Sequence, residues 1–217
     1  MKTFFSMVAL IICTSLFSNA ADDAAPVRVA CVGDSITYGA GVAGREANCY
    51  PVVLGKLLGA KYETKNFGVN GATLLKQGDM PYWKQPAFKQ AADYAPDIVV
   101  LKLGTNDSKP QNWKHKEDFA ADLAAMVDHF ATLPSKPKIF LCLPVPVYKT
   151  QWGINEEIVA GEIIPIIKKV AAEKKAEVID LHAALSGKPE LFPDNVHPNV
   201  GGARLIAEAV QKALAGK

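Results

Sequence analysis

The segment Asp97-Ile98-Val99-Val100-Leu101-Lys102-Leu103 decides the fold of this chain. Its apolar residues follow one another without the alternation of a half-exposed strand, and Gly104 ends the run. Such a run is typical of a strand that is buried on both faces, as strands of parallel sheets are. We therefore expect an α/β protein in which helices cover both faces of a parallel sheet.

The segments on either side of this strand support the same interpretation. Further strands are predicted at 27–32, 62–69, 138–143 and 178–181. Helices are predicted at 50–58, 83–94, 114–132, 155–174 and 200–214. Pro165 is expected to kink the fourth of these helices. The alternation predicts a single-domain, three-layer α/β/α sandwich on a five-stranded, mostly parallel sheet with right-handed crossovers.

Residues 1–20 have the composition of an export signal. Lys2 gives a positive start, residues 4–17 are almost wholly apolar, and Ser18-Asn19-Ala20 supplies the small residues that precede a cleavage site. The apolar stretch is too short for a membrane-spanning helix. We therefore predict a signal peptide at 1–20, a mature domain at 21–217 without a membrane span, and a secreted or periplasmic location.

Charge and cysteine content limit the classes of partner. The formal net charge is +2, and removal of Lys2 with the signal leaves +1, so the basic excess that phosphate binding needs is missing and no nucleic-acid partner is expected.

Cys31, Cys49 and Cys142 remain after cleavage, and an odd number leaves at least one free thiol. Cys31 and Cys142 lie in apolar strand segments and are expected to be small buried side chains. No cysteine and histidine have the spacing of metal ligands, so no metal site is expected.

Glycines and polar residues follow the predicted strands at the point where each strand ends. Residues 33–35 (G-D-S) follow the first strand, residues 66–71 close the second, and residues 104–107 (G-T-N-D) follow the third. A long loop at 144–155 follows the fourth strand, and residues 194–198 (D-N-V-H-P) lie beyond the fifth. Ligands of open parallel sheets bind outside the carboxyl ends of the strands. These segments are therefore expected to form one site.

The residue types in these segments are those that acyl transfer requires. A serine hydroxyl such as that of Ser35 is a poor nucleophile unless a base takes its proton, and His197 is the candidate base. Asp194 lies three residues earlier and can orient the same imidazole through Nδ1–H. The oxyanion of a tetrahedral intermediate needs fixed donors, which the backbone N–H groups of Gly71 and Ser35 and the side-chain amide of Asn106 can provide.

These four blocks, in this order, resemble the SGNH (GDSL-like) hydrolases over nearly the whole predicted mature chain. The resemblance implies a flavodoxin-like three-layer sandwich and an esterase that uses no cofactor and no metal. It makes Ser35 the nucleophile and completes a triad with Asp194 and His197. It also assigns the oxyanion hole to Ser35, Gly71 and Asn106.

Two positions of the pattern need comment. Ile36 stands where the family name has Leu, which exchanges one apolar residue for another. Gly68 competes with Gly71 for the glycine of the second block. Gly71 is preferred because the spacing N-x-x-x-x-G-x-T, from Asn66 to Thr73, matches the family better.

Other motifs compete with this assignment. His182 follows the last predicted strand with Asp180 two residues before it, but that spacing suits sheet packing equally well. Residues 39–44 spell G-x-G-x-x-G, but they begin several residues after the first strand, whereas a dinucleotide-binding turn follows its strand directly. No G-x-S-x-G surrounds Ser35, which disfavours the α/β-hydrolase fold.

Aromatic residues of the loop at 144–155 bear on the substrate. The rings of Tyr148 and Trp152 could stack on a sugar or could cap the core, and both interpretations stay open. The resemblance to exported members of the family favours removal of acetyl groups from carbohydrate, with a small-molecule or glycan ester as the partner. A lipase or thioesterase for longer acyl chains and a non-catalytic carbohydrate-binding module are the alternatives. The intact Ser, His, Asp and Asn argue against the last of these.

Overall fold

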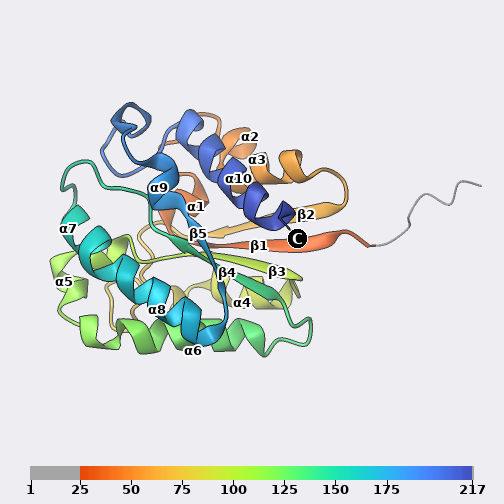
Figure 1. Ribbon diagram of the computed structural model, residues 1–217, viewed down its shortest axis with the longest axis horizontal. Helices are drawn as coiled ribbons and strands as arrows, with labels where there is room; N and C mark the ends of the chain where they lie inside the picture. Colours follow the sequence, from red (N-terminus) through yellow and green to blue (C-terminus); the bar gives the residue numbers. More distant parts are fainter. Residues whose placement is uncertain (1–24, 217) are drawn as a thin grey trace, which may run out of the picture.

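The computed structural model describes residues 25–216, so the signal peptide predicted at 1–20 lies outside the described residues. A five-stranded sheet in the order β2-β1-β3-β4-β5 forms its centre, and every strand pairing is parallel (Figure 1). This order is that of flavodoxin-like proteins. The strands are β1 (Val27–Gly33), β2 (Tyr62–Gly68), β3 (Ile98–Lys102), β4 (Lys138–Leu143) and β5 (Glu177–Asp180).

Helices cover both faces of the sheet, so the predicted three-layer α/β/α sandwich is confirmed (Figure 1). One face carries α1 (Ser35–Tyr38), α2 (Arg45–Asn48), α3 (Tyr50–Leu58), α9 (Leu181–Leu185) and α10 (Val200–Ala215). The other carries α4 (Pro86–Asp93), α5 (Pro110–Trp113), α6 (Phe119–Ala131), α7 (Glu156–Ile158) and α8 (Ile164–Lys174).

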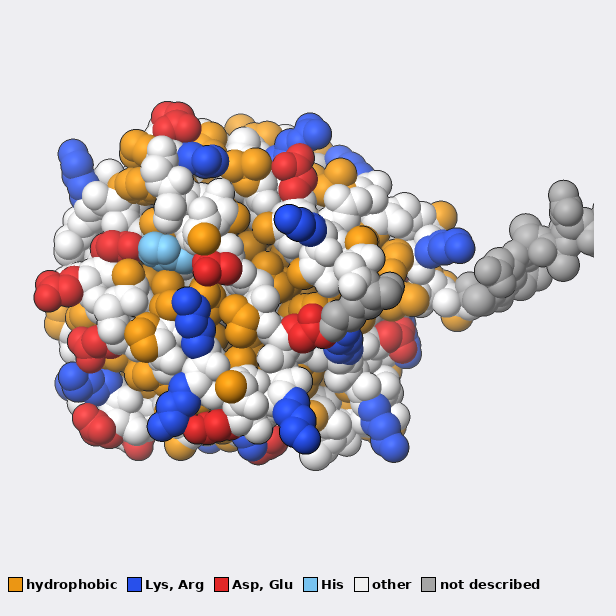
Figure 2. Space-filling model, viewed as in Figure 1, with side chains coloured by type: hydrophobic (Ala, Val, Ile, Leu, Met, Phe, Trp, Pro, Cys, Tyr) orange, Lys and Arg blue, Asp and Glu red, His pale blue; other side chains and the backbone are white. Residues whose placement is uncertain are grey.

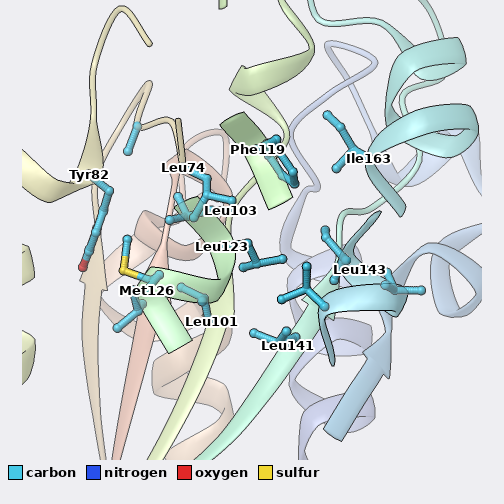
Figure 3. Packing of buried hydrophobic residues seen from close by; sticks show 14 of the residues in the cluster. Leu74, Tyr82, Leu101, Leu103, Phe119, Leu123, Met126, Leu141, Leu143 and Ile163 are labelled. Carbon is cyan, nitrogen blue, oxygen red and sulfur yellow. The ribbon is translucent and has the colours of Figure 1, made fainter. Parts of the chain in front are cut away.

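The core consists of two apolar clusters, one on each face of the sheet. Because successive side chains of a strand point to opposite faces, Leu101 of β3 packs beneath α6 with Phe119 and Met126, whereas Val100 faces α10. Figure 3 shows Leu101, Leu103, Leu141 and Leu143 in this cluster, with Leu123 lying among them. Burial on both faces explains why these strand segments read as unbroken apolar runs.

Two differences between the predicted and the observed helices occur at prolines. The helix predicted at 155–174 begins at α7 and widens into a π-helical turn, Val159–Ile163, directly before Pro165 in α8. Pro165 has no N–H to donate and its ring would collide with the carbonyl four residues back, which accounts for a wider turn at this point of the helix. The helix predicted at 83–94 starts as a 3₁₀ turn, Tyr82–Lys84, and α4 begins only at Pro86.

All three cysteines in the described region are free thiols and buried, as predicted for Cys31 and Cys142. Burial raises the pKa of Cys142 to about 12 and that of Cys31 further still, so both thiols stay protonated and unreactive.

Between residues 25 and 216, none of the helices is both long enough and apolar enough to cross a bilayer. Figure 2 shows basic and acidic side chains interspersed over the face that is viewed, in keeping with the small net charge.

Candidate active site

A tight turn between β1 and α1 presents Ser35 at the carboxyl edge of the sheet. Asp34 caps α1 by accepting the backbone N–H of Ile36 at 3.0 Å. The turn requires glycine at position 33, since a Cβ there would lie 2.2 Å from Oγ1 of Thr37. Ser35 is therefore the first residue of α1, two residues after the end of β1.

In the loop before α10, the carboxylate of Asp194 bonds both to the backbone of the loop and to the ring of His197. Oδ1 of Asp194 accepts the backbone N–H groups of Val196 and His197 at 3.0 and 2.7 Å, while Oδ2 lies 2.8 Å from Nδ1 of His197. Asn195 takes the left-handed conformation, with φ 69°, which asparagine tolerates better than most residues. Partial burial acts to raise the pKa of Asp194, but these hydrogen bonds outweigh it and hold the pKa below its usual value.

His197 connects this carboxylate to Ser35. Nε2 lies 2.8 Å from Oγ of Ser35, and the serine is only 8% exposed. The carboxylate of Asp194 can only accept, so Nδ1 carries the proton and Nε2 accepts from the serine hydroxyl. The three side chains therefore form one hydrogen-bonded series in which the imidazole is in the tautomer of a general base.

Gly71 and Asn106 line the same pocket as Ser35 and His197. Gly71 has φ 78°, a conformation that favours glycine. Asn106 begins the 3₁₀ turn Asn106–Ser108 after β3, and its Nδ2 donates to the carbonyl of Ala72 at 3.1 Å. That bond uses one of the two amide hydrogens, and the second remains for the pocket. Both predicted donors are thus brought beside the serine.

Gly68, the competing glycine, has a different task. A Cβ at Gly68 would lie 2.1 Å from the backbone nitrogen of Tyr38, so the missing side chain allows β2 to pack closely against α1. Gly68 is not among the residues that line the pocket around Ser35, whereas Gly71 is. The spacing argument for Gly71 therefore agrees with its position.

The pocket has a volume of about 230 Å³ and combines the predicted residues with a short apolar wall. It is lined by Ser35, Ala40, Asn70, Gly71, Asn106, Lys109, Trp152, Ile154 and His197. Residues 25–216 contain no group of three or more His, Cys, Asp or Glu side chains that could hold a metal ion. The 2.8 Å contact between Oγ of Ser35 and Nε2 of His197 supports nucleophilic attack by Ser35, with proton transfer through His197.

Of the two aromatic candidates, the structure brings only Trp152 to the pocket. Its ring centroid lies 5.5 Å from that of His197, and the residue is 56% exposed. Tyr148 instead packs on Phe192, donates its hydroxyl to the carbonyl of Leu185 at 2.6 Å, and is not among the pocket residues. Its ring caps the core, which is the alternative interpretation of the sequence. The backbone of Trp152 is left-handed, with φ 51°.

The competing motifs have structural roles. Nε2 of His182 contacts Oε1 of Glu156 at 2.7 Å, and the other carboxylate oxygen of Glu156 accepts the backbone N–H of Val147 at 2.7 Å. His182 therefore secures the start of the loop at 144–155 rather than approaching Ser35. Residues 39–44 form a loop after α1 and lead into the four-residue helix α2, which is not the strand–turn–helix of a dinucleotide site.

A buried ion pair and a buried carboxyl group lie near the site, and neither was predicted from the sequence. Lys102 and Asp34 form an ion pair at 2.9 Å with both side chains fully buried. The carboxylate of Asp107 accepts the backbone N–H groups of Leu75 and Leu74 at 2.8 and 3.0 Å, and burial raises its pKa to about 7 in spite of those bonds. The ion pair could have been suspected from Lys102, a lysine inside an apolar strand. A buried charge is rarely found without a partner, so such a lysine indicates an acidic side chain nearby.

The fold and the Ser–His–Asp series define an SGNH-type hydrolase. The model of the GDSL-like lipase/acylhydrolase family matches residues 31–205, and the chain belongs to this family. The class predicted from the four sequence blocks is thereby confirmed.

Comparison with individual proteins adds relatives of known name. The chain is 41% identical over 206 residues to an acetylxylan esterase of Xylanibacter ruminicola, a match that covers 87% of this chain and 43% of that protein. The chain thus spans less than half of that relative. A carbohydrate acetylesterase from Sinorhizobium meliloti has a TM-score of 0.71 at 19% identity, covering 87% of this chain and 98% of that one. An M. smegmatis aryl esterase also has a TM-score of 0.71, at 20% identity, covering 86% and 97%. These two solved structures share the fold.

Proposed function

We propose that this protein is a serine esterase that removes short acyl groups, chiefly acetyl, from carbohydrate O-esters through an acyl-enzyme intermediate. The observation that carries the proposal is the series of two 2.8 Å contacts from Ser35 through His197 to Asp194, at the wall of a small pocket. Similarity to an acetylxylan esterase supports acetyl as the acyl group and makes acetylated xylan the first polymer to test. We also propose that residues 1–20 direct export of the mature domain at 21–217.

Acylation begins when Nε2 of His197 takes the hydroxyl proton of Ser35. Oγ then forms a bond to the carbonyl carbon of the ester, and the carbonyl electrons move to its oxygen. The backbone N–H groups of Ser35 and Gly71 and the amide of Asn106 stabilise this oxyanion. As the oxyanion collapses, the bond to the alcohol breaks, and His197 delivers its proton to the departing sugar oxygen.

Deacylation repeats the same steps with water in place of the sugar. His197 takes a proton from water, and the resulting hydroxide adds to the acyl carbon. Collapse of this second intermediate releases the carboxylic acid and returns the proton to Oγ of Ser35. In both halves Asp194 stabilises the imidazolium, and its lowered pKa keeps it ionised at neutral pH.

The size of the pocket and the nature of its edge bear on the substrate. A volume of about 230 Å³ is small beside ligand pockets in general, which are roughly 300–1,000 Å³. It can receive an acetyl group but gives little room for a long chain. Trp152, exposed at the pocket edge, offers a flat amphipathic ring on which a sugar can stack.

The acyl-chain profile is the first test of this proposal. We expect kcat/KM to be highest for acetyl esters and to fall steeply beyond about four acyl carbons, because a pocket of about 230 Å³ leaves little room for further methylenes. Nitrophenyl esters of graded chain length provide the measurement, and an early burst of nitrophenol would report the acyl-enzyme. A profile that peaks at eight carbons or more, as in a lipase, would overturn the short-acyl proposal.

Replacement of Trp152 by alanine tests whether this residue contacts the sugar part of the substrate rather than its acyl group. Trp152→Ala should lower kcat/KM for an acetylated sugar more than for nitrophenyl acetate, by about 2–12-fold, the loss expected of one aromatic contact. Trp152→Phe keeps a ring and serves as the matched control, with most of the activity retained. Equal losses on both substrates would mean that Trp152 orients His197 rather than binding the sugar.

Removal of one oxyanion donor gives a further expectation. Asn106→Ala should lower kcat by roughly 10²–10³-fold, because the donor acts on charge that develops in the transition state. Steady-state kinetics on nitrophenyl acetate give kcat and KM separately. If KM alone rises, Asn106 binds the ground-state ester and the oxyanion assignment is wrong.

A further inference from the structure

Lys102 is a buried cation for which the mechanism above has no use. It is the last residue of β3 and its side chain is fully buried. Nζ lies 3.1 and 2.9 Å from the two carboxylate oxygens of Asp34 and 2.9 Å from Oγ1 of Thr105. An ammonium group has three donors, and these three acceptors use all of them.

The partners of Lys102 belong to two different segments of the site. Asp34 directly precedes Ser35 and caps the helix that Ser35 begins. Thr105 directly precedes Asn106. The strands beneath these two turns are neighbours, since Gly33 pairs with Lys102 in the register of β1 and β3. One side chain therefore ties the turn of the nucleophile to the turn of the oxyanion donor.

Stability alone does not explain a lysine at this position. Val100, two residues earlier on the same face of β3, belongs to an apolar cluster with Cys31 and Cys142. An apolar residue would continue that stripe without the cost of burying two charges, and such replacements of buried ion pairs are often neutral or stabilising. What the ammonium adds is directional: it fixes a carboxylate and a hydroxyl at set distances from one point.

We propose that Lys102 is a positioning residue that sets the separation of Ser35 and Asn106, and so holds the nucleophile and the oxyanion donor in register. This inference rests on the proposed function. Lys102 is too deep to contact substrate, so its effect reaches the reaction through Asp34 and Thr105. A small displacement of either turn would misplace an oxyanion donor, and displacements of about 1 Å can lower rates by about 10²-fold.

Thr105 provides the mildest test, because a change there leaves the ion pair intact. Thr105→Val keeps the shape but removes the hydroxyl that accepts from Lys102, and kcat on nitrophenyl acetate should fall by about tenfold with little change in KM. Thr105→Ser restores the hydroxyl without the methyl group and should recover most of kcat. If the valine and serine variants have equal kcat, the contact does not position the site and the proposal is overturned.

The ion pair is tested with both charges removed together. Lys102→Met alone would leave Asp34 charged and unpaired in the core and could prevent folding. The double variant Lys102→Met with Asp34→Asn removes both charges, and the asparagine still accepts the N–H of Ile36. We expect a folded protein whose kcat is lower by about 10²-fold. A folded double variant with wild-type kcat would show that the pair only fills space.

A control variant and the activity of the wild type show whether a loss of kcat is specific to Lys102 and its partners. Ile206→Val, in the buried face of α10, lowers stability without touching either turn. Its kcat, measured well below all melting temperatures, should be that of the wild type. A loss in this variant too would mean that kcat follows general stability, which overturns positioning by Lys102. If the wild type itself hydrolyses no ester, the proposed function fails, and this inference falls with it. An active wild type with unaffected variants refutes this inference alone.

Discussion

Replacement of Ser35 by alanine is expected to abolish ester hydrolysis and to leave the fold intact. The nucleophile has no substitute, and loss of a triad serine lowers kcat by roughly 10⁶-fold in enzymes of this type of chemistry. Only Oγ is removed, together with its hydrogen bond to His197, so stability should change by no more than about 1 kcal/mol. Thermal melts and kcat/KM on nitrophenyl acetate measure the two effects on the same sample.

Covalent labelling makes this experiment independent of turnover. A fluorophosphonate should modify the wild-type protein once, at Ser35, and should fail to modify Ser35→Ala. Ser186→Ala, which removes an exposed hydroxyl that donates to the carbonyl of His182, is the matched control and should be labelled normally. Esterase activity well above background in purified Ser35→Ala would assign the nucleophile to another residue.

Removal of His197 should have an effect of similar size. His197→Ala leaves Oγ of Ser35 without the base that lies 2.8 Å from it, and kcat should fall by roughly 10⁵–10⁶-fold. The wild-type rate should decline on the acid side, because a protonated imidazole cannot accept the serine proton. A pH–rate profile and the kinetics of the variant supply the measurements.

His182→Ala is the control for this prediction. The structure places His182 against Glu156, and its loss should loosen the loop at 144–155 while leaving most of the activity. A folded but fully inactive His182 variant would return that residue to candidacy as the base. Addition of EDTA to the wild type should leave the rate unchanged, and inhibition that zinc reverses would contradict a mechanism built on Ser35 and His197.

The fold could be predicted because its information is local. The run from Ile98 to Leu101 in β3 is apolar, since helices cover both faces of the strand, and the same is true of Ile139 to Leu143 in β4. Parallel strands then bring their carboxyl ends to one edge, which is why residues as distant as Ser35 and His197 could be assigned to one site. The contact between Asp194 and His197 was the simplest to predict, because the two residues are three positions apart in one loop.

Features that depend on distant contacts were not predictable in the same way. Asp34 and Lys102 are 68 residues apart, and nothing local to either indicates that the two side chains meet. The choice between Tyr148 and Trp152 depended on a left-handed backbone at Trp152 and on a hydrogen bond from Tyr148 to α9. The π-helical turn before Pro165 shows that a proline predicts a disturbance but not its form.

The placement of Trp152 gives the protein an optical probe of its own active site. Of the three tryptophans, Trp113 is buried, whereas Trp152 is largely exposed and its indole lies 5.5 Å from the imidazole of His197. An occupant of the pocket changes the surroundings of this indole, because Trp152 lines the pocket together with Ser35. The intrinsic fluorescence of the enzyme should therefore change when a fluorophosphonate modifies Ser35, and this change should be missing in Ser35→Ala. The emission would then report occupation of the site without a chromogenic substrate.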